Sequence, residues 1–203
     1  MSGYKIRFNG LDRLYDHYKT EFNEAAQKSW QLGSAILGKE TEKLESSVAK
    51  KYSRKYAVAV GSATDGLYFA LRAAGIGPEH KVFCPVLSYV ATAGAIRRTS
   101  SKIKFIDTDN NGNIGSFFHE KTPDAVVYVN LYGNIADYDR IQAYCQKNQI
   151  VLIEDAAQSQ GAHYKNSPSG TLGDVSVFSF DPMKNMPSFG SGCLLYTSDA
   201  ADE

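Results

Sequence analysis

Short runs of apolar residues alternate with segments of helical periodicity along most of the chain. Such runs predict buried strands, and apolar residues recurring at a spacing of three to four predict amphipathic helices. Strands are predicted at residues 56–60, 81–85, 103–107, 125–131, 150–154 and 175–180. Helices are predicted at residues 39–51, 65–74, 88–98 and 137–147. Residues 11–30 have mixed helical spacing and contain neither Pro nor Gly.

Strands that are short, apolar and separated by helices indicate an α/β fold. The expected architecture is a mostly parallel sheet that is buried on both faces and sandwiched by helices. The sequence contains no internal repeat, no low-complexity tract and no linker. Ligands of such sheets bind at the carboxyl ends of the strands. The residues that follow each predicted strand are therefore the first candidates for a functional site.

Composition removes several classes of function. The 22 basic side chains are balanced by 22 acidic ones, which leaves no electrostatic footprint for nucleic acid. No apolar run approaches the ~18–20 residues of a membrane span, and the first residues lack the apolar core of a signal peptide. Cys84, Cys145 and Cys193 lie far apart without a C-x-x-C motif. We expect reduced thiols in a cytoplasmic protein with no metal site.

The last eleven residues, 193–203, resemble one reading frame of a transposon-type sequencing adapter. A natural strand and tail is the alternative interpretation. We expect adapter read-through that is not native, and we leave it out of the predicted fold, so that 175–180 is the last predicted strand. Residues 1–192 are then the N-terminal part and an incomplete large domain, and a C-terminal small domain is absent.

Three strand ends carry residue types with chemical potential. Small residues at 61–64 follow the first strand; they could cradle a phosphate on free backbone N–H groups or simply cap the next helix. Glu154 and Asp155 end the fifth strand, where an acid could pair with a cationic ligand group or cap a helix beside a solvated neighbour. Lys184 follows the last predicted strand, either solvated or desolvated enough to act as a nucleophile.

Taken together and in order, segments between about residues 37 and 192 resemble the DegT/StrS family of pyridoxal-phosphate-dependent sugar aminotransferases. No single segment is specific, but their joint order and spacing are. The segments are 38–45, 62–64, 75–78, 85–92, 105–107, 131–133, 137–139, 153–158, 161–162, 170–171, 178–180 and 184–185. The resemblance implies the aspartate-aminotransferase fold, with the large domain of a fold-type I transferase that binds pyridoxal 5'-phosphate (PLP).

The resemblance also implies two catalytic residues. Lys184 matches the lysine that bonds covalently to PLP and then moves a proton between the substrate carbon and the cofactor. Asp155 matches the aspartate that pairs with the pyridine nitrogen and keeps the ring an electron sink. Members that remove a hydroxyl in place of transferring an amine carry His at the lysine position, so Lys184 favours amine transfer. His163 follows the motif and is interpreted as a surface residue.

The remaining cofactor contacts are implied in the same way. Tyr89 matches the aromatic residue that stacks on the pyridine ring. Ala63 and Thr64 match the turn that holds the phosphate, and Ser179 matches a further phosphate contact. Gln158 matches a side chain near the 3-oxygen of the cofactor.

The sequence departs from the family pattern at Ala63, at Gly66 and in the segment after the lysine. The family usually has Gly at the position of Ala63 and a small apolar residue at the position of Gly66. The segment after the lysine usually reads Gly-acid-Gly-Gly, whereas residues 190–193 here read Gly-Ser-Gly-Cys. Loss of the last Gly at Cys193 is consistent with the suspected read-through.

By resemblance, the parent protein moves an amino group from an amino acid, L-glutamate, to a nucleotide-linked keto-sugar for amino-sugar and surface-polysaccharide biosynthesis. It is expected to form a homodimer with active sites at the subunit interface. Two alternatives remain: another PLP protein of the same fold, either a sugar dehydratase or a cofactor-binding regulator, and an inactive truncated fragment.

Overall fold

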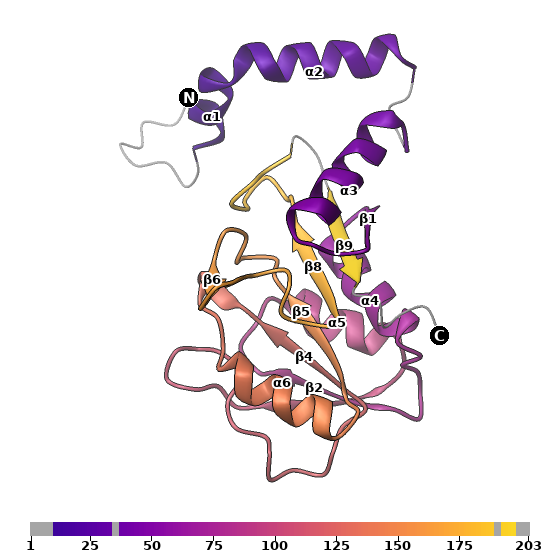
Figure 1. Ribbon diagram of the computed structural model, residues 1–203, viewed down its shortest axis with the longest axis vertical. Helices are drawn as coiled ribbons and strands as arrows, with labels where there is room; N and C mark the ends of the chain where they lie inside the picture. Colours follow the sequence, from indigo (N-terminus) through magenta and orange to yellow (C-terminus); the bar gives the residue numbers. More distant parts are fainter. Residues whose placement is uncertain (1–9, 34–36, 189–191, 198–203) are drawn as a thin grey trace. The chain divides into compact units, whose positions relative to one another are not determined.

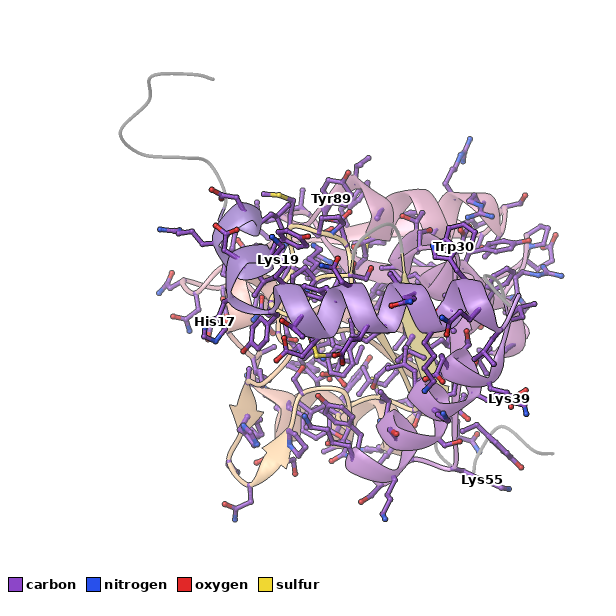
Figure 2. The ribbon with its side chains drawn as sticks, turned by 90° about the horizontal axis from the view of Figure 1, so that it is seen from above. His17, Lys19, Trp30, Lys39, Lys55 and Tyr89 are labelled. Atoms are coloured by element: carbon purple, nitrogen blue, oxygen red, sulfur yellow. The ribbon has the colours of Figure 1, made fainter. Side chains whose placement is uncertain are left out.

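The structure is a computed structural model that describes residues 10–33, 37–188 and 192–197. It divides the chain into two units, Met1–Leu44 and Glu45–Glu203. The first contains α1 (Leu11–His17), α2 (Lys19–Gln31) and the start of α3 (Lys39–Lys51). No residue of α1 or α2 is buried, and Trp30 near the end of α2 is 77% exposed (Figure 2).

The second unit contains a sheet of seven strands in its described part, in the order β1-β9-β8-β5-β4-β2-β3 (Figure 1). The strands are β1 (Tyr56–Val60), β2 (Lys81–Pro85), β3 (Lys102–Ile106), β4 (Ala125–Val129), β5 (Val151–Asp155), β8 (Val175–Ser179) and β9 (Cys193–Thr197). Among these described strands, β9 is antiparallel to both of its neighbours, β1 and β8, and every other pairing is parallel. The expected mostly parallel sheet is confirmed. A separate hairpin pairs β6 (His163–Tyr164) with β7 (Ser167–Pro168).

Helices cover both faces of the sheet. The helices of this unit are α4 (Ala63–Ala73), α5 (Val90–Arg98), α6 (Tyr138–Lys147) and the end of α3. Successive side chains of a strand point to opposite faces of the sheet, so the buried residues form separate clusters on the two faces. Val82 on β2 joins the cluster built with α4 and α5, whereas its neighbour Phe83 joins the cluster that contains Ile141 of α6. Among the described residues no helix combines the length and apolar character that a membrane span requires.

The segment set aside as foreign enters the sheet, and this corrects the predicted fold. Residues Cys193–Thr197 form β9, which pairs with β1 on one side and β8 on the other. Cys193, Leu194 and Leu195 are buried. The prediction that residues 175–180 form the last strand is therefore wrong. The physical reason is that β9 satisfies backbone N–H and C=O groups on the facing edges of β1 and β8. The origin of this segment stays a prediction, and residues 198–203 and Gly190 lie outside the described residues.

Two element boundaries differ from the sequence prediction for identifiable reasons. The strand predicted to reach residue 131 ends at Val129, because Leu131–Gly133 form a 3-10 turn in which Tyr132 has φ 56° and Gly133 has φ 80°. Helix α4 begins at Ala63, two residues early, because Ser62 caps it.

Gly66 in α4 lies where a side chain would collide with the sheet. A Cβ atom at this position would stand 2.9 Å from Val177 Cγ1 and 3.2 Å from Cys193 Sγ. We expect Gly66→Ala to lower the free energy of unfolding by about 1 kcal/mol, because overpacking outweighs the helix propensity gained. Gly94 in α5 is the matched control, since its Cβ would meet nothing within 4 Å. Urea unfolding should show Gly94→Ala to be neutral or stabilising; equal effects of the two substitutions would contradict the packing.

Candidate functional site

All seven residues proposed from the sequence line one pocket of about 390 Å³ at the carboxyl ends of the strands. They are Ala63, Thr64, Tyr89, Asp155, Gln158, Ser179 and Lys184. They come from the ends of different elements: the N-terminus of α4, the start of α5, the end of β5, the end of β8 and the loops after these two strands. The sheet brings them together because parallel strands end at the same edge. His163 lies in β6, is exposed and does not line this pocket.

One end of the pocket is formed by the N-terminus of α4. Ser62 is the N-cap: its Oγ accepts a hydrogen bond from Asp65 N (3.1 Å) and donates one to Asp65 Oδ2 (2.8 Å). No described residue accepts a hydrogen bond from the N–H of Ala63 or Thr64. Both interpretations of this segment, helix cap and phosphate cradle, therefore apply. Ser62 caps the helix, while the next two backbone N–H groups remain free to bind an anion.

Asp65 puts a negative charge next to this cradle, and the fold compensates it. Arg98 Nη1 lies 2.7 Å from Asp65 Oδ1, and the guanidinium stacks on the ring of Tyr68, with its carbon 4.2 Å from the ring centroid. The hydrogen bond from Arg98, followed by that from Ser62, lowers the pKa of Asp65. The pairing reduces the repulsion that an isolated Asp65 carboxylate would exert on a bound phosphate.

Asp155 lies at the floor of the pocket and is 5% exposed. Its Oδ2 accepts a hydrogen bond from Thr92 Oγ1 (2.9 Å), and its Oδ1 accepts one from Ala157 N (3.2 Å). Burial raises the pKa of Asp155, whereas these two hydrogen bonds and the charge of Lys184 oppose the rise. Thr92 was not predicted to contact the acid, although it belongs to one of the segments that carry the family resemblance.

Glu154 points to the opposite face of the sheet and is fully buried, so the interpretation of a solvated neighbour is wrong. Its Oε1 accepts hydrogen bonds from Asn130 Nδ2, Ser169 Oγ and Gly170 N at 2.8–2.9 Å. Its Oε2 accepts further bonds from Leu172 N and Ser176 Oγ at 2.9 and 2.8 Å. A buried carboxylate is tolerated because donors surround it. Glu154 thus ties the 169–172 loop to β5, directly next to Asp155.

Lys184 is half-buried in the turn that follows β8, and hydrogen bonds from backbone N–H groups to backbone and side-chain oxygens hold this turn. Lys184 N donates to Asp181 O (2.9 Å), and Asp181 Oδ1 accepts from Met183 N (2.9 Å). Ser179 Oγ accepts from Asp181 N (3.3 Å). The turn places the Lys184 amine in the same pocket as the Asp155 carboxylate.

The remaining two residues, Tyr89 and Gln158, also line the pocket. Tyr89 is the N-cap of α5, and the residue is 68% exposed, so that its aromatic ring is accessible for stacking (Figure 2). Gln158 Oε1 accepts a hydrogen bond from Tyr132 N (3.0 Å). This bond occupies the carbonyl side of the amide and leaves the Nε2 donors for another partner.

The donor set fits PLP. Free amides of Ala63 and Thr64 suit its phosphate, the buried Asp155 carboxylate suits a protonated ring nitrogen, and the Lys184 amine suits its aldehyde. The pocket also has lining residues that the sequence analysis did not name as cofactor contacts: Gly61, Ser62, Leu67, Ala91, Val129, Ala157, Asp181, Met183 and Gly192. Most of them lie within two residues of a named residue in the sequence, and this proximity is the signal that could have found them.

Comparisons with known proteins agree with this geometry. The model of the DegT/DnrJ/EryC1/StrS aminotransferase family matches residues 16–203. The "pleiotropic regulatory protein" of Geobacillus stearothermophilus is 34% identical over 93% of this chain and 52% of its own length. The UDP-2-acetamido-2-deoxy-3-oxo-D-glucuronate aminotransferase of Pseudomonas aeruginosa is 35% identical over 96% of this chain and 55% of its own length. The chain thus spans about half the length of the curated relatives it matches.

Solved structures share the fold. S. venezuelae DesV, in complex with a ketimine intermediate, has a TM-score of 0.91 and is 31% identical, covering 97% of this chain and 54% of that protein. The GDP-4-keto-6-deoxymannose-3-dehydratase ColD, as a mutant with bound GDP-perosamine, has a TM-score of 0.82 and is 26% identical, covering 87% of this chain and 48% of that protein. Both an aminotransferase family and a dehydratase therefore share this architecture.

Proposed function

Because the chain belongs to the DegT/DnrJ/EryC1/StrS aminotransferase family, we propose that it is the PLP-binding half of a sugar aminotransferase. The enzyme would move an amino group from an amino acid, L-glutamate, to a nucleotide-linked keto-sugar. The observation that carries this proposal is the pocket that joins Lys184, the buried Asp155 and the free N-terminal amides of α4.

PLP, when bound, supplies an electron sink for the carbanion formed at the substrate carbon. Lys184 would take up the proton from the substrate carbon at its Nζ and deliver it to the cofactor. Asp155 would hold the proton on the ring nitrogen through a charge-assisted hydrogen bond. Tyr89 would cover one face of the ring and restrict the access of water.

Further contacts would fix the remaining parts of the cofactor. The N–H groups of Ala63 and Thr64, together with Ser179, would bind the phosphate, where the dipole of α4 also favours negative charge. Gln158 would direct its Nε2 to the 3-oxygen, because its Oε1 is already bonded to Tyr132 N. Each role uses an atom that the fold leaves available in the pocket.

The cellular setting is part of the same proposal. The parent enzyme would work in the cytoplasm as a homodimer and supply amino sugars for surface polysaccharide. The name of the P. aeruginosa relative, an aminotransferase of a UDP-linked oxo-sugar, supports the amino-sugar part of this proposal. Residues 193–203 would be adapter read-through. Sequencing the gene across codon 193 tests this directly, and an unbroken genomic reading frame through codon 203 would refute it.

A cofactor-binding regulator is the second candidate, favoured by the name of the G. stearothermophilus relative. A dehydratase is disfavoured because Lys184 stands where, by the family resemblance, dehydratases carry His. An inactive fragment is the third alternative, since the relatives are about twice as long. These alternatives differ in two measurable properties: whether the chain binds PLP and whether the bound PLP reacts with an amino donor.

A half-reaction separates them without knowledge of the sugar. The purified chain is saturated with PLP and mixed with L-glutamate, with D-glutamate as the control donor. An aminotransferase should lose the absorbance of bound PLP and release one equivalent of 2-oxoglutarate with the L-isomer alone. PLP binding without this release would favour the regulator, and absence of PLP binding would favour the inactive fragment.

A further inference from the structure

Thr92 is buried beneath the pocket and contacts its central acid, although it does not line the pocket itself. The side chain is 1% exposed, and its Oγ1 lies 2.9 Å from Asp155 Oδ2. The two residues are separated by 63 positions in the sequence and come from α5 and β5. Since Asp155 carries no proton when ionised, the hydroxyl of Thr92 must be the donor of this bond.

The first turn of α5 links this hydroxyl to the stacking ring. Thr92 N donates to Tyr89 O (3.1 Å), so the residue that holds the acid is bonded to the residue that offers the aromatic surface. Ala157 N donates to the other oxygen of Asp155 at 3.2 Å. With both oxygens engaged, the carboxylate has one orientation, and its remaining lone pairs are available to the pocket.

The charged and titratable groups around Asp155 do not replace this bond. Lys184 favours the ionised form of Asp155 across the pocket, whereas buried Glu154 on the same strand disfavours it. Cys193 on β9 also lies near Asp155, and burial raises the pKa of its thiol. Burial has the largest influence and raises the pKa of Asp155, so each hydrogen-bond donor to this carboxylate is needed to favour its charged form.

We propose that Thr92 is a positioning residue, whose hydroxyl keeps the Asp155 carboxylate charged and turned toward the ring nitrogen of PLP. This inference rests on the proposed function, because it assumes that PLP occupies the pocket. Thr92 would not touch the reacting atoms. It would act through Asp155 by stabilising the charged form that a protonated ring nitrogen requires.

The test compares three variants of the full chain. Thr92→Val removes the hydroxyl and keeps the shape, and Thr92→Ser restores the hydroxyl. Thr99→Val is the matched control, because Thr99 is buried at the end of the same helix but its Oγ1 bonds to Ile96 O and Ser101 Oγ. The measurements are the dissociation constant of PLP as a function of pH and the unfolding of each apo chain in urea.

Thr92→Val is expected to weaken PLP binding about tenfold or more, as for a lost hydrogen bond to a charged group. As the pH is lowered, the PLP affinity of Thr92→Val should begin to fall at a higher pH than that of the unmodified chain. The reason is that loss of the hydroxyl raises the pKa of Asp155 further, so that this acid takes up its proton earlier. Thr92→Ser should restore both properties, and Thr99→Val should keep the unmodified pH profile even if it unfolds more easily.

Two outcomes are unfavourable and can be told apart. If the unmodified chain binds PLP but Thr92→Val shows the affinity and pH profile of Thr99→Val, the positioning role is overturned while the proposed function stands. If the unmodified chain does not bind PLP, the proposed function fails and the role of Thr92 fails with it.

Discussion

Replacement of Lys184 by alanine is expected to abolish the covalent attachment of PLP and to slow the half-reaction with L-glutamate at least ~10³-fold. The amine of Lys184 is proposed both to bond the cofactor and to transfer the proton, and general acid–base catalysis alone contributes ~10²–10⁴-fold. Borohydride reduction of the PLP-loaded chain, followed by mass spectrometry of its peptides, should find the cofactor on Lys184 and on no peptide of the variant.

Two further variants separate charge from nucleophilicity. Lys184→Arg keeps a cation opposite Asp155 but lacks the reactive amine, so it should still bind PLP without attachment. Lys165→Ala removes an exposed lysine that is paired with Asp139 on the surface and should leave attachment and rate unchanged. Attachment of PLP to a lysine other than Lys184 in the unmodified chain would refute the assignment.

Asp155→Asn should act in opposite directions on function and stability. The neutral amide cannot neutralise a protonated ring nitrogen, so we expect PLP affinity to fall by about tenfold to hundredfold. The apo chain should be as stable as the unmodified chain or more stable at neutral pH, because a buried carboxylate disfavoured by desolvation is removed. Thr92 and Ala157 can still bond to the asparagine side chain, which keeps the local geometry.

The stability difference should depend on pH in a defined direction. Burial raises the pKa of Asp155 above its ordinary value of 3.8, so the folded chain binds this proton more tightly than the unfolded chain. The unmodified chain therefore loses stability as the pH rises from about the ordinary value to the raised one. The advantage of Asp155→Asn should be absent below this window and complete above it.

Urea unfolding of the apo chains across this pH range measures the effect. Asp139→Asn is the matched control, because Asp139 is exposed and pairs with Lys165 on the surface. It should change stability little, as surface ion pairs contribute at most about 1 kcal/mol. An Asp155→Asn chain with undiminished PLP affinity would contradict the role of this acid.

Local pattern was enough for most elements and for the candidate residues of the site. Short apolar runs and helical spacing depend on neighbouring residues alone, and they located six strands of the sheet to within one or two residues at each end. The residue types at the strand ends and the family resemblance then led to Lys184 and Asp155. Both line the same pocket because parallel strands end at one edge of the sheet.

Contacts between segments that are distant along the chain could not be predicted from the sequence. The order of the strands, the insertion of β9 between β1 and β8, and the burial of Glu154 all depend on partners far along the chain. Residues 193–197 were left out of the predicted fold, but they form a strand because their backbone groups pair with the facing edges of β1 and β8; the origin of this segment stays a prediction.

By itself, then, the sequence determined the alternation of strands and helices, the residues at the strand ends and the family that they resemble, because these follow from local periodicity and residue chemistry. Only the tertiary structure decided that Thr92 bonds to Asp155, that Arg98 neutralises Asp65 beside the cradle, and that Glu154 faces away from the pocket. Those contacts depend on which side chains come together when the strands and helices pack, and no local pattern contains that information.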